Sequence, residues 1–142
     1  MSTTTWVLAI VAMGIIALAD LSTKQSAGKI SPSLGTLIYA VTTIAIPLVW
    51  TIWTRSNGGL QITREGVLWS ISVGVCFSIF TGLMFLIFSQ GVNLSVGSPV
   101  VRMGGIVLAA TLGIVVFREG LNLQYLVGFL LAAVGIFLVV TR

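Results

Sequence analysis

The chain contains 142 residues, of which 57% are apolar and only 7% are charged, and its mean hydropathy is +1.15. This composition excludes an ordinary soluble domain and predicts an integral membrane protein. The net charge of +4 comes from seven cations and three acidic residues. The cations are scattered singly and form no basic stripe, so no nucleic-acid partner is expected.

The apolar residues are grouped into five blocks of membrane-spanning length. An α-helix rises about 1.5 Å per residue and the hydrocarbon layer is about 30 Å thick, so about 20 apolar residues make one crossing. In chain order, the predicted helices cover residues 6–24, 34–54, 66–88, 96–117 and 121–140. The connections are short, and backbone in lipid must satisfy its hydrogen bonds within helices. The sequence therefore predicts an all-α membrane protein in which residues 1–142 form a single domain of five transmembrane helices.

Two ionisable residues lie inside these helices, where a charge is costly and usually marks a pathway or a partner. Asp20 is about one turn from the end of the first helix, and Arg102 has a similar depth from the same face in the fourth helix. They either pair with each other and hold the two helices together, or they line a polar cavity and meet the charge of a substrate. A planar guanidinium matches carboxylate and phosphate groups, so Arg102 favours an anionic or zwitterionic ligand.

Three further polar residues are predicted near the same face of the membrane as Asp20 and Arg102. Lys24 is one turn beyond Asp20 on the same helix face, Tyr39 enters the second helix at a similar depth, and Ser98 lies near the start of the fourth helix. The candidate substrate-binding residues are thus Asp20, Lys24, Tyr39, Ser98 and Arg102. For Lys24 an alternative is that its side chain only extends to the lipid headgroups.

Apart from Arg102, which lies within the fourth predicted helix, the cations are shared equally between the two faces of the membrane. With five crossings the termini lie on opposite faces, called B for the N-terminal face and A for the other. Lys24, Lys29 and Arg142 are predicted on face A, and Arg55, Arg64 and Arg118 on face B. An excess of Lys and Arg in cytoplasmic loops normally sets orientation, so this tie predicts dual topology unless another factor fixes one orientation. Two oppositely inserted copies can form an antiparallel dimer with the symmetry of an inverted-repeat transporter.

No enzymatic, metal or cofactor site is expected. The chain has no His, one Cys and three acidic residues, which leaves no nucleophile with a base, no paired carboxylates and no metal-ligand cluster. Cys76, inside the third predicted helix, is expected to be a small packing residue. No Walker-type phosphate loop is present, so transport would draw on a gradient, with Asp20 as the candidate proton site.

Both ends of the sequence carry motifs of a known family. Near the C-terminus stands the run REGLNLQYLVGFLLAAVG, which contains Glu119, Leu121, Gly128, Leu131 and Gly135. Near the N-terminus stands the run ALADLSTKQSAGKISPSLGTLIYA. With these motifs the chain resembles one five-helix half of the EamA-type transporters of the drug/metabolite transporter superfamily. It is similar, more distantly, to the small multidrug resistance proteins.

The resemblance implies a multi-pass secondary transporter that moves small polar metabolites or drugs by alternating access. Most EamA proteins carry two five-helix units, so this single unit implies an inverted homodimer, or a heterodimer with a related half, that completes a ten-helix transporter. It also implies the lipid bilayer of a bacterial or archaeal cell (inner) membrane. Two alternatives stay open: a proton-coupled cation exporter centred on Asp20, and a non-transporting channel or assembly subunit whose charges only pair helices.

Overall fold

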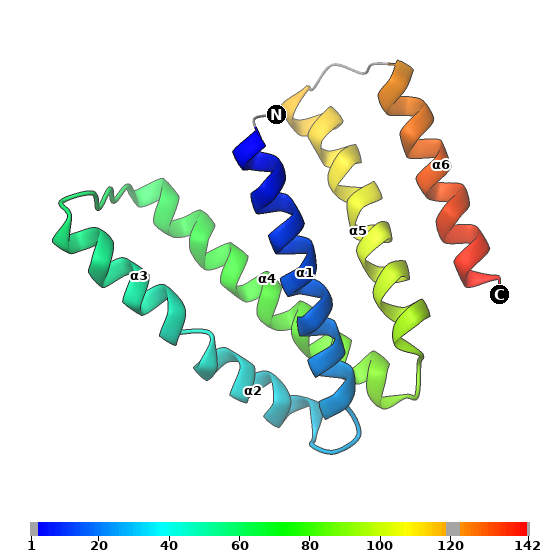
Figure 1. Ribbon diagram of the computed structural model, residues 1–142, viewed down its shortest axis with the longest axis horizontal. Helices are drawn as coiled ribbons and strands as arrows, with labels where there is room; N and C mark the ends of the chain where they lie inside the picture. The colour runs from blue at the N-terminus through cyan, green and yellow to red at the C-terminus, as the bar shows by residue number, and fades with distance from the viewer. Residues whose placement is uncertain (1–2, 119–122, 142) are drawn as a thin grey trace. The chain divides into compact units, whose positions relative to one another are not determined.

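Over residues 3–118 and 123–141, which the computed structural model describes, the chain forms six α-helices (Figure 1). They are α1 (Thr3–Ser26), α2 (Pro32–Thr42), α3 (Ala45–Ser56), α4 (Arg64–Ser89), α5 (Leu94–Phe117) and α6 (Leu123–Val140). The chain divides into two compact units: Met1–Gly91 contains α1 to α4, and Val92–Arg142 contains α5 and α6. Each unit is described by itself.

Four helical segments among the described residues are long and apolar enough to cross a membrane: Thr3–Ser26, Pro32–Ser56, Arg64–Ser89 and Leu94–Val116. Most of their apolar side chains are exposed, and the described residues bury only three large ones, Met84, Phe85 and Phe88. A soluble domain would bury such side chains in a core, whereas a spanning helix turns them to lipid. The structure thus agrees with the prediction of an all-α integral membrane protein. The fifth helix predicted from the sequence corresponds to α6, an apolar helix of 18 residues that is not among these four segments.

The helix predicted over residues 34–54 is interrupted near its middle. α2 ends at Thr42 and α3 begins at Ala45, although both belong to one apolar span. Pro47 has no backbone N–H to offer to the carbonyl of Thr43, and its ring crowds that carbonyl, so the regular helix cannot continue through this point. The expectation of one continuous helix is therefore corrected to two helices within the span.

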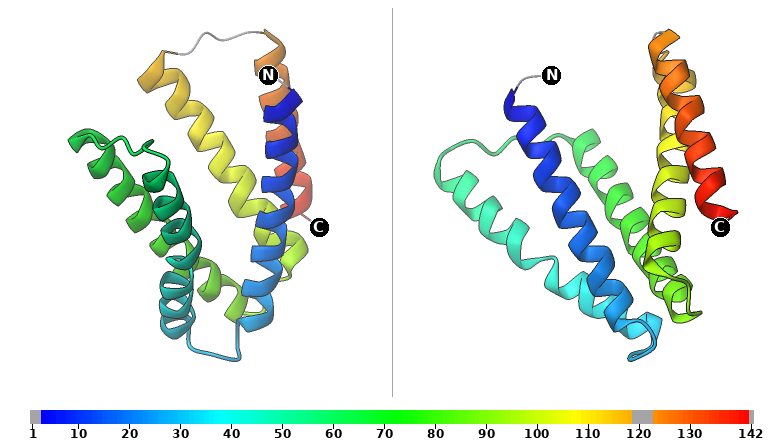
Figure 2. Two further views of the ribbon diagram at one scale, coloured as in Figure 1. Left: turned by 60° about the vertical axis from the view of Figure 1, so that its left-hand side comes forward. Right: turned by 45° about the vertical axis from the view of Figure 1, so that its right-hand side comes forward.

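α4 is the centre of the first unit, because both α1 and α2 pack on it. The three helices meet where α1 ends, α2 begins and α4 ends, and they diverge toward the other end, as both views of Figure 2 show. Gly35 permits the close approach of α2, since a Cβ at this position would lie 2.8 Å from the Phe85 ring. One turn along α4, a Cβ at Gly82 would lie 3.3 Å from the hydroxyl oxygen of Thr36.

The second unit is a helical hairpin in which α5 and α6 pack side by side (Figure 1). A Cβ at Gly135 of α6 would lie 4.0 Å from the terminal methyl of Met103. α5 ends at Phe117 and is followed by the C-cap residue Arg118, whose φ of 51° is left-handed. Glu119 and Leu121, which were expected to open the last helix, lie outside the described residues.

Candidate functional site

Asp20 is buried although it lies in a helix whose apolar residues are exposed. Its exposed fraction is 5%, whereas Leu18 is 64% and Leu21 is 43% exposed. In a helix of a soluble protein the apolar side chains would be covered and the carboxylate would be exposed. The reversed pattern indicates that α1 turns its carboxylate to protein and its apolar side chains to lipid.

Lys24 lies one turn beyond Asp20 and is held against an aromatic ring. Its Nζ is 5.6 Å from the ring centroid of Phe88 in α4, and Phe88 is only 2% exposed. A cation over a ring at this distance gains about 0.5–1 kcal/mol at an exposed site and more where water is excluded. The contact places the half-buried Lys24 against α4. Asp20, Lys24 and Phe88 are called the Asp20 cluster below.

The face of α4 that carries Phe88 is the buried face of this helix. Its residues recur at the three- and four-residue spacing of one helix face: Thr81, Met84, Phe85 and Phe88. Thr81 donates its hydroxyl to the Phe77 carbonyl at 2.8 Å, so it is satisfied within its own helix. Among the described residues no buried side-chain nitrogen or oxygen lacks a hydrogen-bond partner. A buried carboxylate such as Asp20 is stable only in such a satisfied environment.

Tyr39 lies in α2, one turn beyond Gly35, and is half-buried. α2 also borders an open groove against α4, with a volume of about 670 Å³. Small and hydroxyl-bearing side chains make up much of its lining: Pro32, Ser33, Thr36, Leu37, Ala40, Ser78, Gly82 and Leu86. Tyr39 is not part of this lining, and the groove shares no residue with the Asp20 cluster.

Ser98 and Arg102 belong to the second unit. They are four residues apart in α5 and are both half-buried, so they share one helix face. The five predicted site residues therefore form two groups: Asp20, Lys24 and Tyr39 lie in the first unit, and Ser98 and Arg102 lie in the second. The structure brings Asp20 and Lys24 together on one face of α1. The pairing of Asp20 with Arg102 stays a prediction from the sequence.

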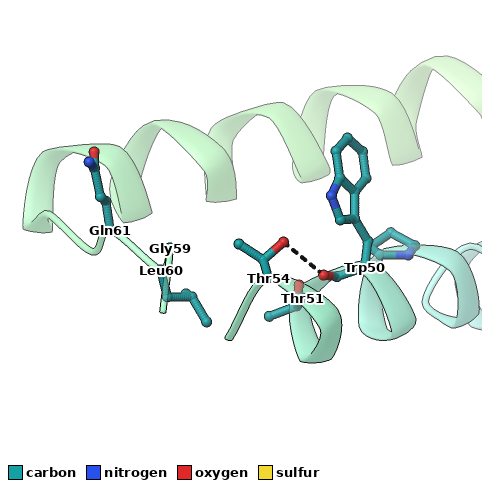
Figure 3. A pocket seen from close by; sticks show the side chains of 7 residues that line it. Trp50, Thr51, Thr54, Gly59, Leu60 and Gln61 are labelled. Carbon is teal, nitrogen blue, oxygen red and sulfur yellow. Dashed lines mark hydrogen bonds between the residues drawn. The ribbon is translucent and has the colours of Figure 1, made fainter. Parts of the chain in front are cut away.

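A pocket along α3 and the loop that follows this helix was not predicted from the sequence. It has a volume of about 420 Å³ and is lined by α3 and the following loop, through Pro47, Trp50, Thr51, Thr54, Gly59, Leu60 and Gln61 (Figure 3). The Thr54 hydroxyl donates to the Trp50 carbonyl at 2.9 Å, the dashed line in Figure 3. The recurrence of Pro47, Thr51 and Thr54 at helical spacing is the sequence signal that would have located this pocket.

Comparisons of the chain with protein-family models, with curated proteins and with solved structures gave no match. Among the described residues, no group of three or more His, Cys, Asp or Glu side chains is placed to hold a metal ion. Cys76, expected as a packing residue, is exposed on α4. The functional assignment therefore depends on the chemistry and placement of the chain's own residues.

Proposed function

We propose that this chain is one five-helix half of a secondary membrane transporter, which moves small polar metabolites or drugs by alternating access. The observation that carries the proposal is the burial of Asp20, 5% exposed, within the spanning helix α1. A charged side chain within a spanning helix is costly, by roughly 2.5–3.5 kcal/mol at the bilayer centre on insertion scales, and Asp20 lies between the centre and the end of its helix. Such residues are retained where they pair or where they act on a substrate or ion pathway.

The rest of the Asp20 cluster supports a polar substrate. A carboxylate, an ammonium group and an aromatic ring lie at one end of the first unit, with Lys24 Nζ 5.6 Å from the Phe88 ring centroid. Opposite charges on one helix face suit a solute that itself carries both charges. Arg102 and Ser98, on one face of α5, are proposed to hold its anionic group, because a guanidinium can bind a carboxylate or phosphate through two parallel hydrogen bonds.

We further propose that α6 is the fifth crossing and that two copies, or this chain and a related half, assemble with opposite orientations. An 18-residue apolar helix approaches the length of one crossing. An odd number of crossings places the termini on opposite faces, and the cations are then divided three to three. An inverted pair reproduces the pseudo-symmetry of inverted-repeat carriers and of the EamA-type transporters that the sequence resembles. The proposed location is a bacterial or archaeal cell membrane.

A proton-coupled cation exporter centred on Asp20 is the second candidate. The near-complete burial of Asp20 favours it, because buried carboxylates in membrane helices serve as proton relays and cation sites. Arg102 would then have no direct part in binding the substrate. The two candidates therefore differ in which of these two residues transport requires.

Solute uptake by the purified protein in proteoliposomes tests the proposal. The wild type should take up members of a panel of zwitterionic, carboxylated, phosphorylated and cationic solutes. Arg102→Lys should lower uptake by about tenfold and leave Tm unchanged, because lysine keeps the charge but loses the planar fork. The matched control is Arg55→Lys, which alters an exposed cation in the last turn of α3 and should leave uptake unchanged.

Two outcomes would replace this assignment. Uptake restricted to cations, abolished by Asp20→Asn and unaffected by Arg102→Ala, would establish the cation exporter. Absence of uptake for every solute, from a protein that remains folded and inserted, would favour the non-transporting subunit.

A further inference from the structure

The break between α2 and α3 lies near the middle of the membrane. The span Pro32–Ser56 has 25 residues, of which Thr43 is the twelfth. At about 1.5 Å per residue this position is close to the midplane of a hydrocarbon layer about 30 Å thick. Residues 41–53 are all exposed, so no other part of the described chain covers the break.

The carbonyl of Thr43 has no hydrogen-bond partner among the described residues. The Thr43 N–H donates to the Tyr39 carbonyl at 2.9 Å, and helical bonding resumes where the Leu48 N–H donates to the Ile44 carbonyl at 3.0 Å. The donor that would reach the Thr43 carbonyl in a continuous helix belongs to residue 47, which is proline. An unsatisfied backbone group in lipid costs several kcal/mol, so lipid is a poor cover for this carbonyl.

A second polar group lies on the same side of α3. Among the described residues, the Thr51 hydroxyl has no hydrogen-bond partner, whereas Thr54 bonds to its own helix at 2.9 Å. Thr43 lies just outside α2 but keeps right-handed helical dihedral angles, with φ of −68° and ψ of −14°, so its carbonyl still points along the chain toward the side that carries Pro47. Pro47, Thr51 and Thr54 all line the pocket of Figure 3.

The opposite side of α3 is apolar. It borders a surface depression lined by Ala45, Ile46, Val49 and Trp53, together with Trp50, which lies between the two sides and also lines the pocket of Figure 3. Val49 is 68% exposed and Trp53 is 65% exposed. This side suits lipid, and α3 is thus a helix with one polar and one apolar face.

We propose that the Pro47–Thr51–Thr54 face of α3, together with the carbonyl of Thr43, lines a water-filled path in the assembled transporter. Irregular backbone at membrane depth is tolerated where it lines a water-filled cavity or is buried in protein. The pocket of about 420 Å³ has room for several waters, each of which occupies about 30 Å³ in the liquid. The inference rests on the proposed function, because it assigns this helix face to the transport pathway.

Cysteine accessibility tests the path. In a Cys76→Ser background, Thr43→Cys and Thr51→Cys probe the polar face, and Val49→Cys is the matched control on the apolar face of the same helix. The reagent is 2-sulfonatoethyl methanethiosulfonate, which does not cross the membrane and reacts with the thiolate. Thiolates form in water and not in lipid, so positions 43 and 51 should react about tenfold faster than position 49 in proteoliposomes.

Equal and slow labelling at all three positions would overturn the path. So would spontaneous disulfide formation between copies at position 43 without labelling, because it would place the break in a dry subunit contact. Thr51→Cys removes no hydrogen bond, so it remains a valid probe if Thr43→Cys fails to fold. Labelling is measured without any substrate, so it is independent of uptake. Fast labelling without uptake would support the water-filled path and reject the transport proposal. Uptake with slow labelling would support transport and reject the path.

Discussion

Gly35 lies where α2 packs on α4, with no room for a side chain. A Cβ at this position would lie 2.8 Å from Cε1 and Cζ of Phe85 and 3.2 Å from Cδ1 of Ile30. Phe85 is 6% exposed, so its ring cannot turn away without opening the buried face of α4. Gly35→Ala should therefore lower the free energy of unfolding by about 1–3 kcal/mol, measured as a lower Tm of the detergent-solubilised protein.

The matched control is Gly74→Ala in α4. Nothing lies within 4 Å of a Cβ at this position, and alanine is the better helix former by about 1 kcal/mol. Its Tm should equal or exceed that of the wild type. If Gly35→Ala unfolds at the wild-type temperature, the close packing of α2 on α4 is not the one described.

Asp20 and Phe88 show what could be predicted at the scale of single residues. A carboxylate in an apolar helix must face protein or water, so the sequence predicted that Asp20 avoids lipid, and its exposed fraction of 5% agrees. The contact of Lys24 with Phe88 could not be predicted, because it depends on how α1 meets α4 and the ring is one of seven Phe in the chain. The binding roles of Tyr39 and Arg102 stay predictions.

At the scale of elements, length and hydropathy predicted where the spans lie but not how their backbone runs. α1, α4 and α5 begin and end within three residues of the bounds expected from the sequence. The break after Thr42 was missed because the residues around it are apolar, and hydropathy does not register a missing hydrogen bond. Pro47 was the local signal, since it removes one donor and crowds one carbonyl.

Pro47→Ala tests that cause. Alanine supplies an N–H to the Thr43 carbonyl, so α2 and α3 should join into one helix and the free energy of unfolding should rise by up to about 3 kcal/mol. Circular dichroism should show more helix, Tm should rise, and uptake should fall because the path loses its irregular backbone. The control is Pro32→Ala at the first turn of α2, where the missing N–H has no partner in any case. Equal effects of the two substitutions would contradict the role given to Pro47.

At the scale of the whole molecule, most apolar side chains among the described residues of a single copy are exposed. Ile46 is 78% exposed in α3, Val115 is 69% exposed in α5, and Leu131 is 67% exposed in α6. Lipid can cover such surfaces, but it cannot cover an exposed backbone carbonyl. The composition of the sequence predicted the apolar surface. The number of copies and their orientation depend on the contact surfaces between copies, and the spacing of apolar residues in the sequence does not identify these surfaces. Charge in the loops is the one sequence feature that bears on orientation.

Dual topology is therefore predicted from the equal division of cations, three on each face. In a Cys76→Ser background, Gln90→Cys in the exposed loop between α4 and α5 should be labelled from both sides of sealed membranes. Two added lysines at the exposed positions Asn57 and Ile62 should bias every copy to one orientation, and lysines at the exposed Gln25 and Ser89 should bias it to the other.

Co-expression of these two biased chains distinguishes an inverted dimer from a parallel dimer. Each biased chain alone should be inserted in one orientation and should not transport, because no oppositely oriented partner is present. Co-expression of the two should restore uptake toward the wild-type level, since an antiparallel pair requires one chain of each orientation. Full uptake by either biased chain alone, or labelling of the wild type from one side only, would show that the functional unit contains chains of a single orientation.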